Sequence, residues 1–100
     1  MGFEIIWTRN AIETFQERIA YLEEHWTEKE IYAFTKRVNE FLQLLETQPS
    51  IFRKSTKKKD THIGLLLKQV SVVYRFKRKG GKIELIAFID NRNNPQNQSY

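Results

Sequence analysis

The side chains able to take part in chemistry are mostly cations in this chain of 100 residues, and they gather in its second half. Residues 1–49 carry five Lys or Arg and nine Glu, which gives a net charge of −4, whereas residues 50–100 carry twelve Lys or Arg and three acids, which gives +9. The twelve cations are Arg53, Lys54, Lys57, Lys58, Lys59, Lys68, Arg75, Lys77, Arg78, Lys79, Lys82 and Arg92. This asymmetry indicates contact with a polyanion or an acidic partner. Lysines on strands also block edge-to-edge pairing of sheets, so a purely protective role is the alternative.

Few other residue patterns point to a specific chemistry. The chain has no Cys, which excludes a disulfide scaffold and a thiolate metal site. Its two histidines, His25 and His62, are isolated and lack the spacing of metal ligands, so we expect no metal and no cofactor. His62 lies near the basic half and could act as a general base, but a single histidine at a strand start is more often solvated. Gly80-Gly81 is not followed by a helix and therefore predicts a turn, not a phosphate cradle.

Two amphipathic helices are expected after a short first strand at residues 3–7. Thr8 or Asn10 can cap the first helix, and the pattern Thr27-Glu28-Lys29-Glu30 predicts a capping box at the start of the second, which Pro49 stops. Apolar residues recur at intervals of three and four on one face of each helix: Ile12, Phe15, Ile19, Leu22 and Trp26, then Ile31, Phe34, Val38, Phe41 and Leu45. Because few residues separate these stretches, the helices must form a hairpin whose apolar faces need a third surface.

Three consecutive strands are expected in the second half. A lysine-rich loop at residues 50–61 precedes apolar β-type segments at about 62–68, 70–77 and 82–90, with a turn at 78–81 between the last two. The order is therefore β-α-α-β-β-β. It predicts an α+β fold in which an antiparallel sheet carries the helical hairpin on one face.

The end of the last predicted strand carries a family resemblance. Residues 83–95 read Ile-Glu-Leu-Ile-Ala-Phe-Ile-Asp-Asn-Arg-Asn-Asn-Pro, which resembles the last strand of RelE/ParE-superfamily toxins, the toxin half of bacterial toxin–antitoxin pairs. The same order of elements belongs to that fold. The resemblance implies one toxin domain at residues 1–92 and a loosely ordered C-terminal tail at 93–100.

The resemblance implies either of two mechanisms. RNA-cutting members act on messenger RNA in the ribosome, and the residues that would serve catalysis here are Arg92, Arg75 and Lys54. Several such relatives carry Arg three residues before the tyrosine of the middle strand, where this chain has Ser71, and some end the last strand with His or Tyr, which is absent beside Asp90. These departures favour the ParE-like branch, whose better-known members poison DNA gyrase, so whether the protein is an enzyme stays open.

The expected partners follow from the same resemblance. Lys57, Lys58, Lys59, Lys68, Lys77 and Tyr74 are the candidate contacts with nucleic acid or another target, although Tyr74 could equally pack in the core and Asp90 could simply pair with Arg92. A cognate antitoxin would neutralise the toxin, and the target would be DNA gyrase or ribosome-bound messenger RNA in the cytoplasm. We expect no signal peptide and no membrane span, while a homo-oligomer stays open. Two alternatives are a non-enzymatic nucleic-acid-binding domain and an inactive, toxin-derived interaction module.

Overall fold

Both helices begin where the sequence predicts. In the computed structural model, which describes residues 3–91, the Thr8 hydroxyl caps α1 (Arg9–His25) by accepting a hydrogen bond from the Ala11 amide. The helix α2 (Glu28–Thr47) begins at the predicted capping box, in which Thr27 and Glu30 each accept from the other's backbone amide. Neither helix of the described residues is long and apolar enough to cross a membrane.

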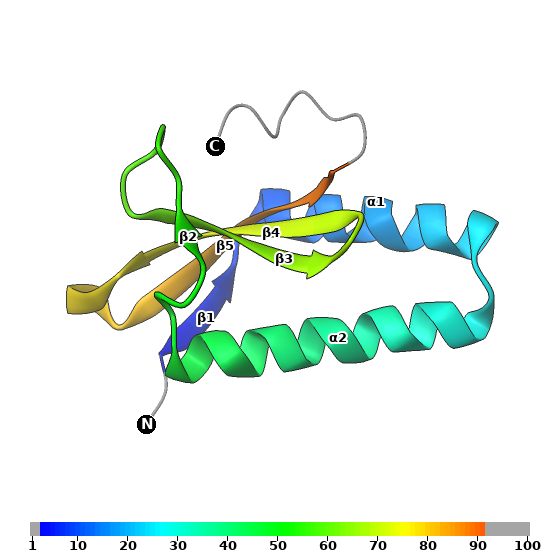
Figure 1. Ribbon diagram of the computed structural model, residues 1–100, viewed down its shortest axis with the longest axis horizontal. Coiled ribbons are helices and arrows are strands. Elements are labelled where there is room, and N and C mark those ends of the chain that lie inside the picture. The colour runs from blue at the N-terminus through cyan, green and yellow to red at the C-terminus, as the bar shows by residue number, and fades with distance from the viewer. Residues whose placement is uncertain (1–2, 92–100) are drawn as a thin grey trace.

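The strands form one five-stranded sheet (Figure 1). They are β1 (Glu4–Trp7), β2 (Arg53–Lys54), β3 (Thr61–Leu67), β4 (Val70–Lys77) and β5 (Lys82–Asp90), in the order β1-β5-β4-β3-β2. A short 3₁₀ turn, η1 (Arg78–Gly80), joins β4 to β5 and ends at Gly81, whose φ of 67° is a conformation that glycine adopts without a steric cost. The α+β class, the β3–β4–β5 meander and the helical hairpin are as predicted.

The sheet differs from the prediction in the direction of its first strand. β2–β3, β3–β4 and β4–β5 are antiparallel, but β1 pairs with β5 in parallel, with Glu4 opposite Lys82 and Trp7 opposite Leu85. The cause is β2, which lies inside the segment predicted as a loop. Because of β2, the chain reverses its direction once more between β1 and β5 than predicted. One additional reversal makes β5 run parallel to β1, where the prediction has it antiparallel.

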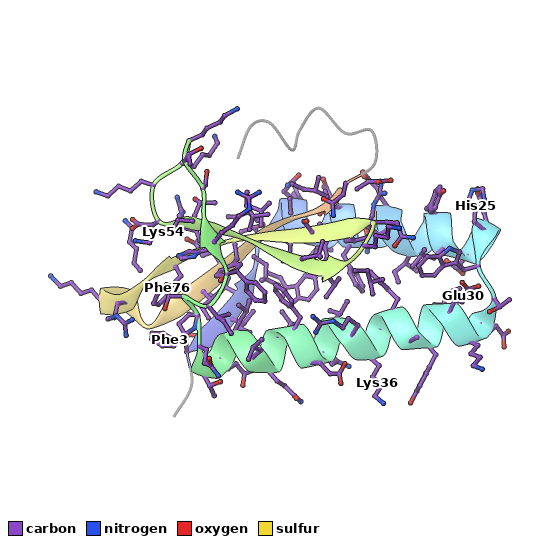
Figure 2. The ribbon with its side chains drawn as sticks, in the orientation of Figure 1. Phe3, His25, Glu30, Lys36, Lys54 and Phe76 are labelled. Atoms are coloured by element: carbon purple, nitrogen blue, oxygen red, sulfur yellow. The ribbon has the colours of Figure 1, made fainter. Side chains whose placement is uncertain are left out.

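The main core lies between the helices and one face of the sheet. Phe34, Phe41 and Leu45 of α2 are at most 1% exposed and pack with buried residues of β4 and β5. Near the C-terminal end of α2, where the Phe3 amide donates to the Glu46 carbonyl, Phe3 packs edge-to-face on Phe76 with ring centroids 5.1 Å apart (Figure 2). The predicted core stripe of α2 is confirmed, but Ile12 of α1 is 43% exposed.

The first helix also protects an edge of the sheet. β1 pairs with β5 only as far as Leu85. Beyond Leu85, side chains of α1 form hydrogen bonds with the edge of β5 that β1 leaves unpaired. The Asn10 amide donates to the Ile86 carbonyl at 2.8 Å, and the Phe88 amide donates to the Thr14 hydroxyl at 2.9 Å. These bonds satisfy backbone groups that would otherwise be free to pair with another strand.

The aspartate of the family-like motif ties β5 to α1. Asp90 Oδ2 lies 3.2 Å from Arg18 Nη1, and both side chains are about four-fifths buried. Arg92, the predicted ion-pair partner of Asp90 and a predicted catalytic residue, lies outside the described residues, as does the predicted tail at 93–100. Within the described chain, Asp90 therefore anchors the end of β5 to α1, and its pairing with Arg92 stays a prediction.

Candidate functional site

The lysine-rich segment before β3 has a defined backbone. The Ser55 amide donates to the Thr61 carbonyl at 2.7 Å, and the Ser55 hydroxyl accepts from the amides of Lys57 and Lys58, both at 3.0 Å. Asp60 closes the loop with a φ of 59°, a left-handed conformation that Asp tolerates better than most residues. Hydrogen bonds of this kind hold the loop backbone in place and thereby fix where its lysines emerge.

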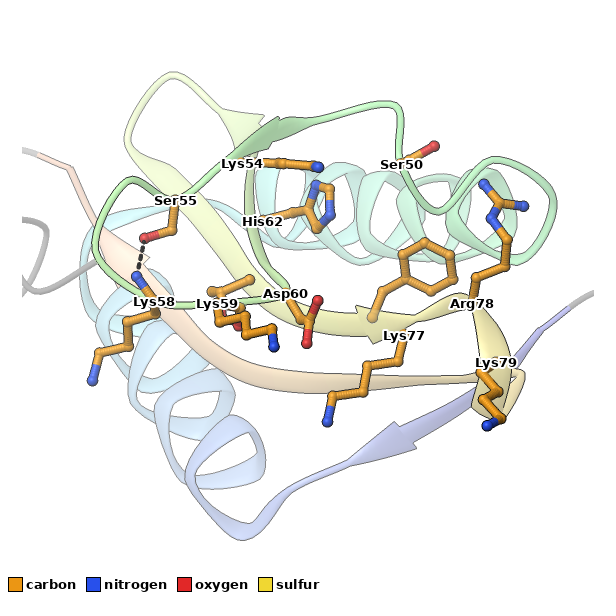
Figure 3. A pocket seen from close by; sticks show the side chains of 12 residues that line it. Ser50, Lys54, Ser55, Lys58, Lys59, Asp60, His62, Lys77, Arg78 and Lys79 are labelled. Atoms are coloured by element: carbon orange, nitrogen blue, oxygen red, sulfur yellow. Dashed lines mark hydrogen bonds between the residues drawn. The ribbon is translucent and has the colours of Figure 1, made fainter.

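A broad, open pocket lies between this loop and the β4–β5 turn (Figure 3). Its volume is about 750 Å³. The lining residues, which we call the basic pocket, are Ser50, Lys54, Ser55, Lys58, Lys59, Asp60, Thr61, His62, Phe76, Lys77, Arg78 and Lys79. Residues 50–62 form one side and residues 76–79 the other, so the pocket exists only where two segments distant in sequence meet.

The charge of the basic pocket is strongly one-sided. Six lining residues are Lys or Arg, and Asp60 is the one carboxylate among the twelve. The ion pairs among residues 3–91 lie elsewhere, and Lys54, Lys59 and Lys77 take no part in them. Cations crowded together in a concave surface repel one another and attract anions, so the pocket is suited to bind a chain of phosphates.

An imidazole lies at the base of the basic pocket. His62 is only 3% exposed, so the expectation that it is solvated is wrong. Its Nδ1 lies 2.9 Å from the Phe52 carbonyl oxygen, and its ring stacks on Tyr74 with centroids 5.2 Å apart and an interplanar angle of 11°. The residue was hard to place from sequence because β3 is buried on both faces. The alternation of His62 with Gly64 and Leu66 was the available signal that it faces the helices.

Tyr74 belongs to the core and not to a binding surface. Its side chain is fully buried, and its hydroxyl donates to the Pro49 carbonyl at 2.7 Å. Burial raises the pKa of Tyr74 far above its ordinary value of 10, against a smaller lowering from the backbone of Phe52. The prediction that Tyr74 contacts the target is therefore wrong, because its ring is not accessible for stacking.

The remaining predicted residues divide between the basic pocket and other places. Lys54, Lys58, Lys59 and Lys77 line it, and Lys57 shares its loop. Lys68 lies in the β3–β4 turn and does not line it. Arg75 lies outside it too, and its guanidinium donates two hydrogen bonds to Glu84 Oε1, at 3.1 and 2.9 Å.

Two pocket cations were not among the predicted site residues. Arg78 and Lys79 belong to the 3₁₀ turn, and the Arg78 guanidinium carbon lies 5.7 Å from the centre of the Phe76 ring. The sequence placed both cations in a turn but gave no sign that this turn faces the lysine loop. Their inclusion therefore depends on the register of β3 against β4, in which Thr61 lies opposite Arg75.

The donor set of the basic pocket fits an anion better than a metal. Within residues 3–91, no three side chains of His, Asp or Glu lie together in a way that could hold a metal ion. Ammonium and guanidinium groups offer hydrogen-bond donors only, which phosphate and carboxylate oxygens accept. The geometry thus indicates a surface for a phosphate backbone or an acidic protein segment.

Known proteins resemble this chain in structure, but no match is found from its sequence. No protein-family model matches the chain, and no curated protein matches it. A chain of the chromosomal ParDE TA system from P. aeruginosa is similar in structure, with a TM-score of 0.69 and 14% identity, over 88% of this chain and 95% of that one. The isolated E. coli RelE toxin has a TM-score of 0.59 and 10% identity, over 96% of this chain and 92% of that one. At these identities the likeness shows a shared fold.

Proposed function

Because the chain has the RelE/ParE fold, we propose that it is the toxin of a toxin–antitoxin pair and that the basic pocket contacts its target. The basic pocket is the observation that carries the proposal. It gathers six cations from two separate segments on a fold that the RelE toxin also has. The proposed site of action is the cytoplasm, where nucleic-acid targets are present.

The basic pocket supports RNA cleavage on the ribosome as the mechanism. Cleaving an RNA strand without help from a metal requires cations that stabilise the charge developing on the phosphate, and a group that accepts the proton of the 2′-hydroxyl. The pocket offers Lys54, Lys58 and Lys59 for the first task and an imidazole for the second. We therefore rank RNA cleavage ahead of gyrase inhibition, which the sequence ranked first.

Inhibition of DNA gyrase is the second candidate. Ser71, which stands where several RNA-cutting relatives have Arg, is only 7% exposed and offers no cation to a substrate. A toxin of this kind would bind gyrase and leave messages intact. In such a toxin, the basic pocket would serve only as a binding surface for gyrase, and no proton transfer would take place.

A purified translation system separates the two candidates. We would add the protein at increasing doses and read message integrity by primer extension, in parallel with a gyrase supercoiling assay. The test variant is Lys58→Glu/Lys59→Glu, and the matched control is Lys29→Glu/Lys36→Glu, which makes the same charge change at two exposed positions of α2. Figure 2 shows Lys36 on this helix. We expect ribosome-dependent cuts with wild type and control, and at least tenfold fewer with the test variant. Intact messages with inhibited gyrase would favour the second candidate, and inactivity in both assays would contradict the proposed function.

We further propose that a cognate antitoxin covers the basic pocket with an acidic segment. Opposite charges speed association and select partners, and a segment rich in Asp and Glu would complement the pocket cations. The product of a small neighbouring gene should bind the wild-type protein more tightly than the Lys58→Glu/Lys59→Glu variant, measured by calorimetry at two salt concentrations. Absence of binding by the products of both adjacent genes would contradict this part of the proposal.

A further inference from the structure

A second basic hollow adjoins the basic pocket at the β4–β5 turn. Its volume is about 320 Å³, and the residues that line it, which we call the second hollow, are Ile6, Arg75, Lys77, Gly80, Lys82 and Glu84. Lys77 lines the basic pocket as well. The turn η1 places Arg78 and Lys79 in the basic pocket and Gly80 in the second hollow. The two hollows therefore meet at the end of β4.

The second hollow lies on the face of the sheet that points away from the helices. Phe76 of β4 belongs to the main core and lines the basic pocket. Arg75 and Lys77 are its neighbours in the strand, so their side chains project from the opposite face. In the register of β4 against β5, Lys77 lies opposite Lys82 and Arg75 lies opposite Glu84. Opposed side chains share a face, so all four lie on this outer face, and a molecule that fills both hollows must pass around the end of β4.

Lys77 and Lys82 form a pair of like charges without a counterion. They lie directly opposite each other, and like charges at opposed positions destabilise a sheet. Within residues 3–91 neither lysine takes part in an ion pair, and Glu4, which lies opposite Lys82 on β1, forms none with it. The folded chain thus retains a repulsion that an anion bound between the two lysines would relieve.

The one carboxylate among the residues of the second hollow is already neutralised. Arg75 donates two hydrogen bonds to Glu84 Oε1, at 3.1 and 2.9 Å. The remaining cations, Lys77 and Lys82, are exposed and determine the charge that a ligand meets. Figure 3 shows Lys77 and Arg78 pointing in opposite directions from neighbouring positions. Positive side chains therefore continue from the basic pocket past Lys77 onto the outer face.

We propose that the second hollow binds the continuation of a single RNA strand whose other part occupies the basic pocket. The strand passes Lys77 at the end of β4, and its backbone phosphates reach Lys82 on the outer face. The occupant is single-stranded because the path bends around the end of one strand. Double-stranded DNA is stiff over about 50 nm, so a duplex cannot follow such a bend, whereas a single strand can track a charged groove. This inference rests on the proposed function for the RNA and adds the path and length of the bound strand.

The dependence of binding on strand length tests this path. The probes are labelled oligouridylates of about 3 nucleotides, enough for the basic pocket alone, and about 12 nucleotides, enough for both hollows, because charged grooves take about 4–16 nucleotides. Binding is measured by fluorescence anisotropy over a series of salt concentrations. The test variant is Lys82→Gln, and the matched control is Lys36→Gln, which loses the same charge at an exposed position of α2.

The expected effect of Lys82→Gln follows from the release of counterions. Losing one phosphate contact makes the slope of log K against log salt shallower by about 0.7, which is about eightfold in affinity at about 50 mM salt relative to 1 M. We expect this loss for the long strand only, and at most about a twofold change for the short strand. The Tm of Lys82→Gln should equal or exceed that of wild type, because the repulsion with Lys77 is gone. Unfolding then cannot explain weaker binding.

Glu84→Gln should change binding in the opposite direction. It removes the one acid of the second hollow and frees the Arg75 guanidinium for a phosphate. The slope for the long strand should therefore become steeper by about 0.7, again without a change for the short strand. An unchanged or weaker affinity for the long strand would contradict the path across the outer face.

The outcomes separate this inference from the proposed function. If Lys82→Gln binds both strands as Lys36→Gln does, or weakens both equally, the second hollow is not a subsite and the inference is overturned, while the basic pocket keeps its role. If Lys58→Glu/Lys59→Glu weakens neither strand, the basic pocket itself fails and the proposed function with it. Tighter binding of duplex RNA, of a DNA strand of the same length or of a poly-glutamate peptide would overturn single-stranded RNA as the occupant.

Discussion

Replacing Gly64 by Ala should push apart the aromatic pair that supports the basic pocket. A Cβ atom built on Gly64 would lie 2.7 Å from Phe41 Cζ and 2.8 Å from Phe52 Cγ, whereas ordinary contacts begin at 3.4 Å. The Phe41 ring must therefore move by about 0.7 Å and the Phe52 ring by about 0.6 Å, the differences between these distances and ordinary contact. Phe41 is fully buried, and its ring stacks on the partly buried Phe52 with centroids 4.7 Å apart, so the Phe41 ring has no open space to enter.

The change in the free energy of unfolding caused by Gly64→Ala can be estimated from the known effects of similar substitutions. Overpacking of this kind costs about 1–3 kcal/mol, and the backbone preference for Ala over Gly returns about 0.5–1 kcal/mol. The middle of these two ranges gives a net loss of about 1 kcal/mol for Gly64→Ala, which lowers Tm by about 4–8 °C in a domain of this size. Urea and thermal denaturation followed by circular dichroism give both quantities.

Gly80→Ala is the matched control. No atom lies within 4 Å of a Cβ built on Gly80, and its φ is not positive, so stability should stay equal or rise by up to about 1 kcal/mol. Equal stability of the two variants would refute the reasoning, because it would mean that the Phe41–Phe52 pair yields freely. The position of the Phe52 carbonyl that His62 contacts would then not be fixed by packing.

Three further predictions concern single interactions. A double-mutant cycle with Arg18→Met and Asp90→Asn should give a coupling free energy of about 1 kcal/mol in urea denaturation, and additive effects would show that the ion pair contributes nothing. Thr27→Ala removes the hydroxyl cap of α2 and should cost about 1 kcal/mol by the same measurement, whereas an unchanged midpoint would contradict a role for the cap. Above pH 10 the unfolded chain loses the Tyr74 proton while the folded chain keeps it, because burial raises the pKa of Tyr74. The stability of wild type should therefore fall with rising pH by up to about 1.4 kcal/mol per unit more than that of Tyr74→Phe, and parallel pH curves would contradict this.

The helices and the meander were predictable because their signals are local. Spacings of three and four residues, the Thr27–Glu30 capping box and the Gly80-Gly81 turn each depend on neighbours in sequence, and β4 and β5 have the predicted bounds. β2 was missed because two exposed residues carry no periodic pattern. The direction of β1 relative to β5 followed from that omission.

The basic character of the candidate site was predictable from the sequence, but the full set of residues that line it was not. The lysines of residues 54–59 were identified from charge alone, yet charge cannot show that the turn at residues 78–79 lies across from them. Tyr74 was a candidate contact with core packing as the alternative, and its alternation with Val72 and Phe76 indicates the core face of β4, where it lies. The burial of His62 could not be read from the sequence, because its ring is held by a carbonyl ten residues earlier in the chain.

The pairing of β1 with β5 has a consequence for how the protein folds during its synthesis on the ribosome. Glu4 of β1 pairs with Lys82, which lies 78 positions later in the chain, so β1 has no partner strand until β5 has been synthesised. One side of the basic pocket is likewise formed only by residues 76–79. A chain emerging from its N-terminus can form helical turns early, but contacts this distant in sequence form late. The nascent chain therefore has no assembled basic pocket until residues 76–79 have been synthesised. The order in which its residues leave the ribosome delays the formation of this surface until after β4, without any bound partner.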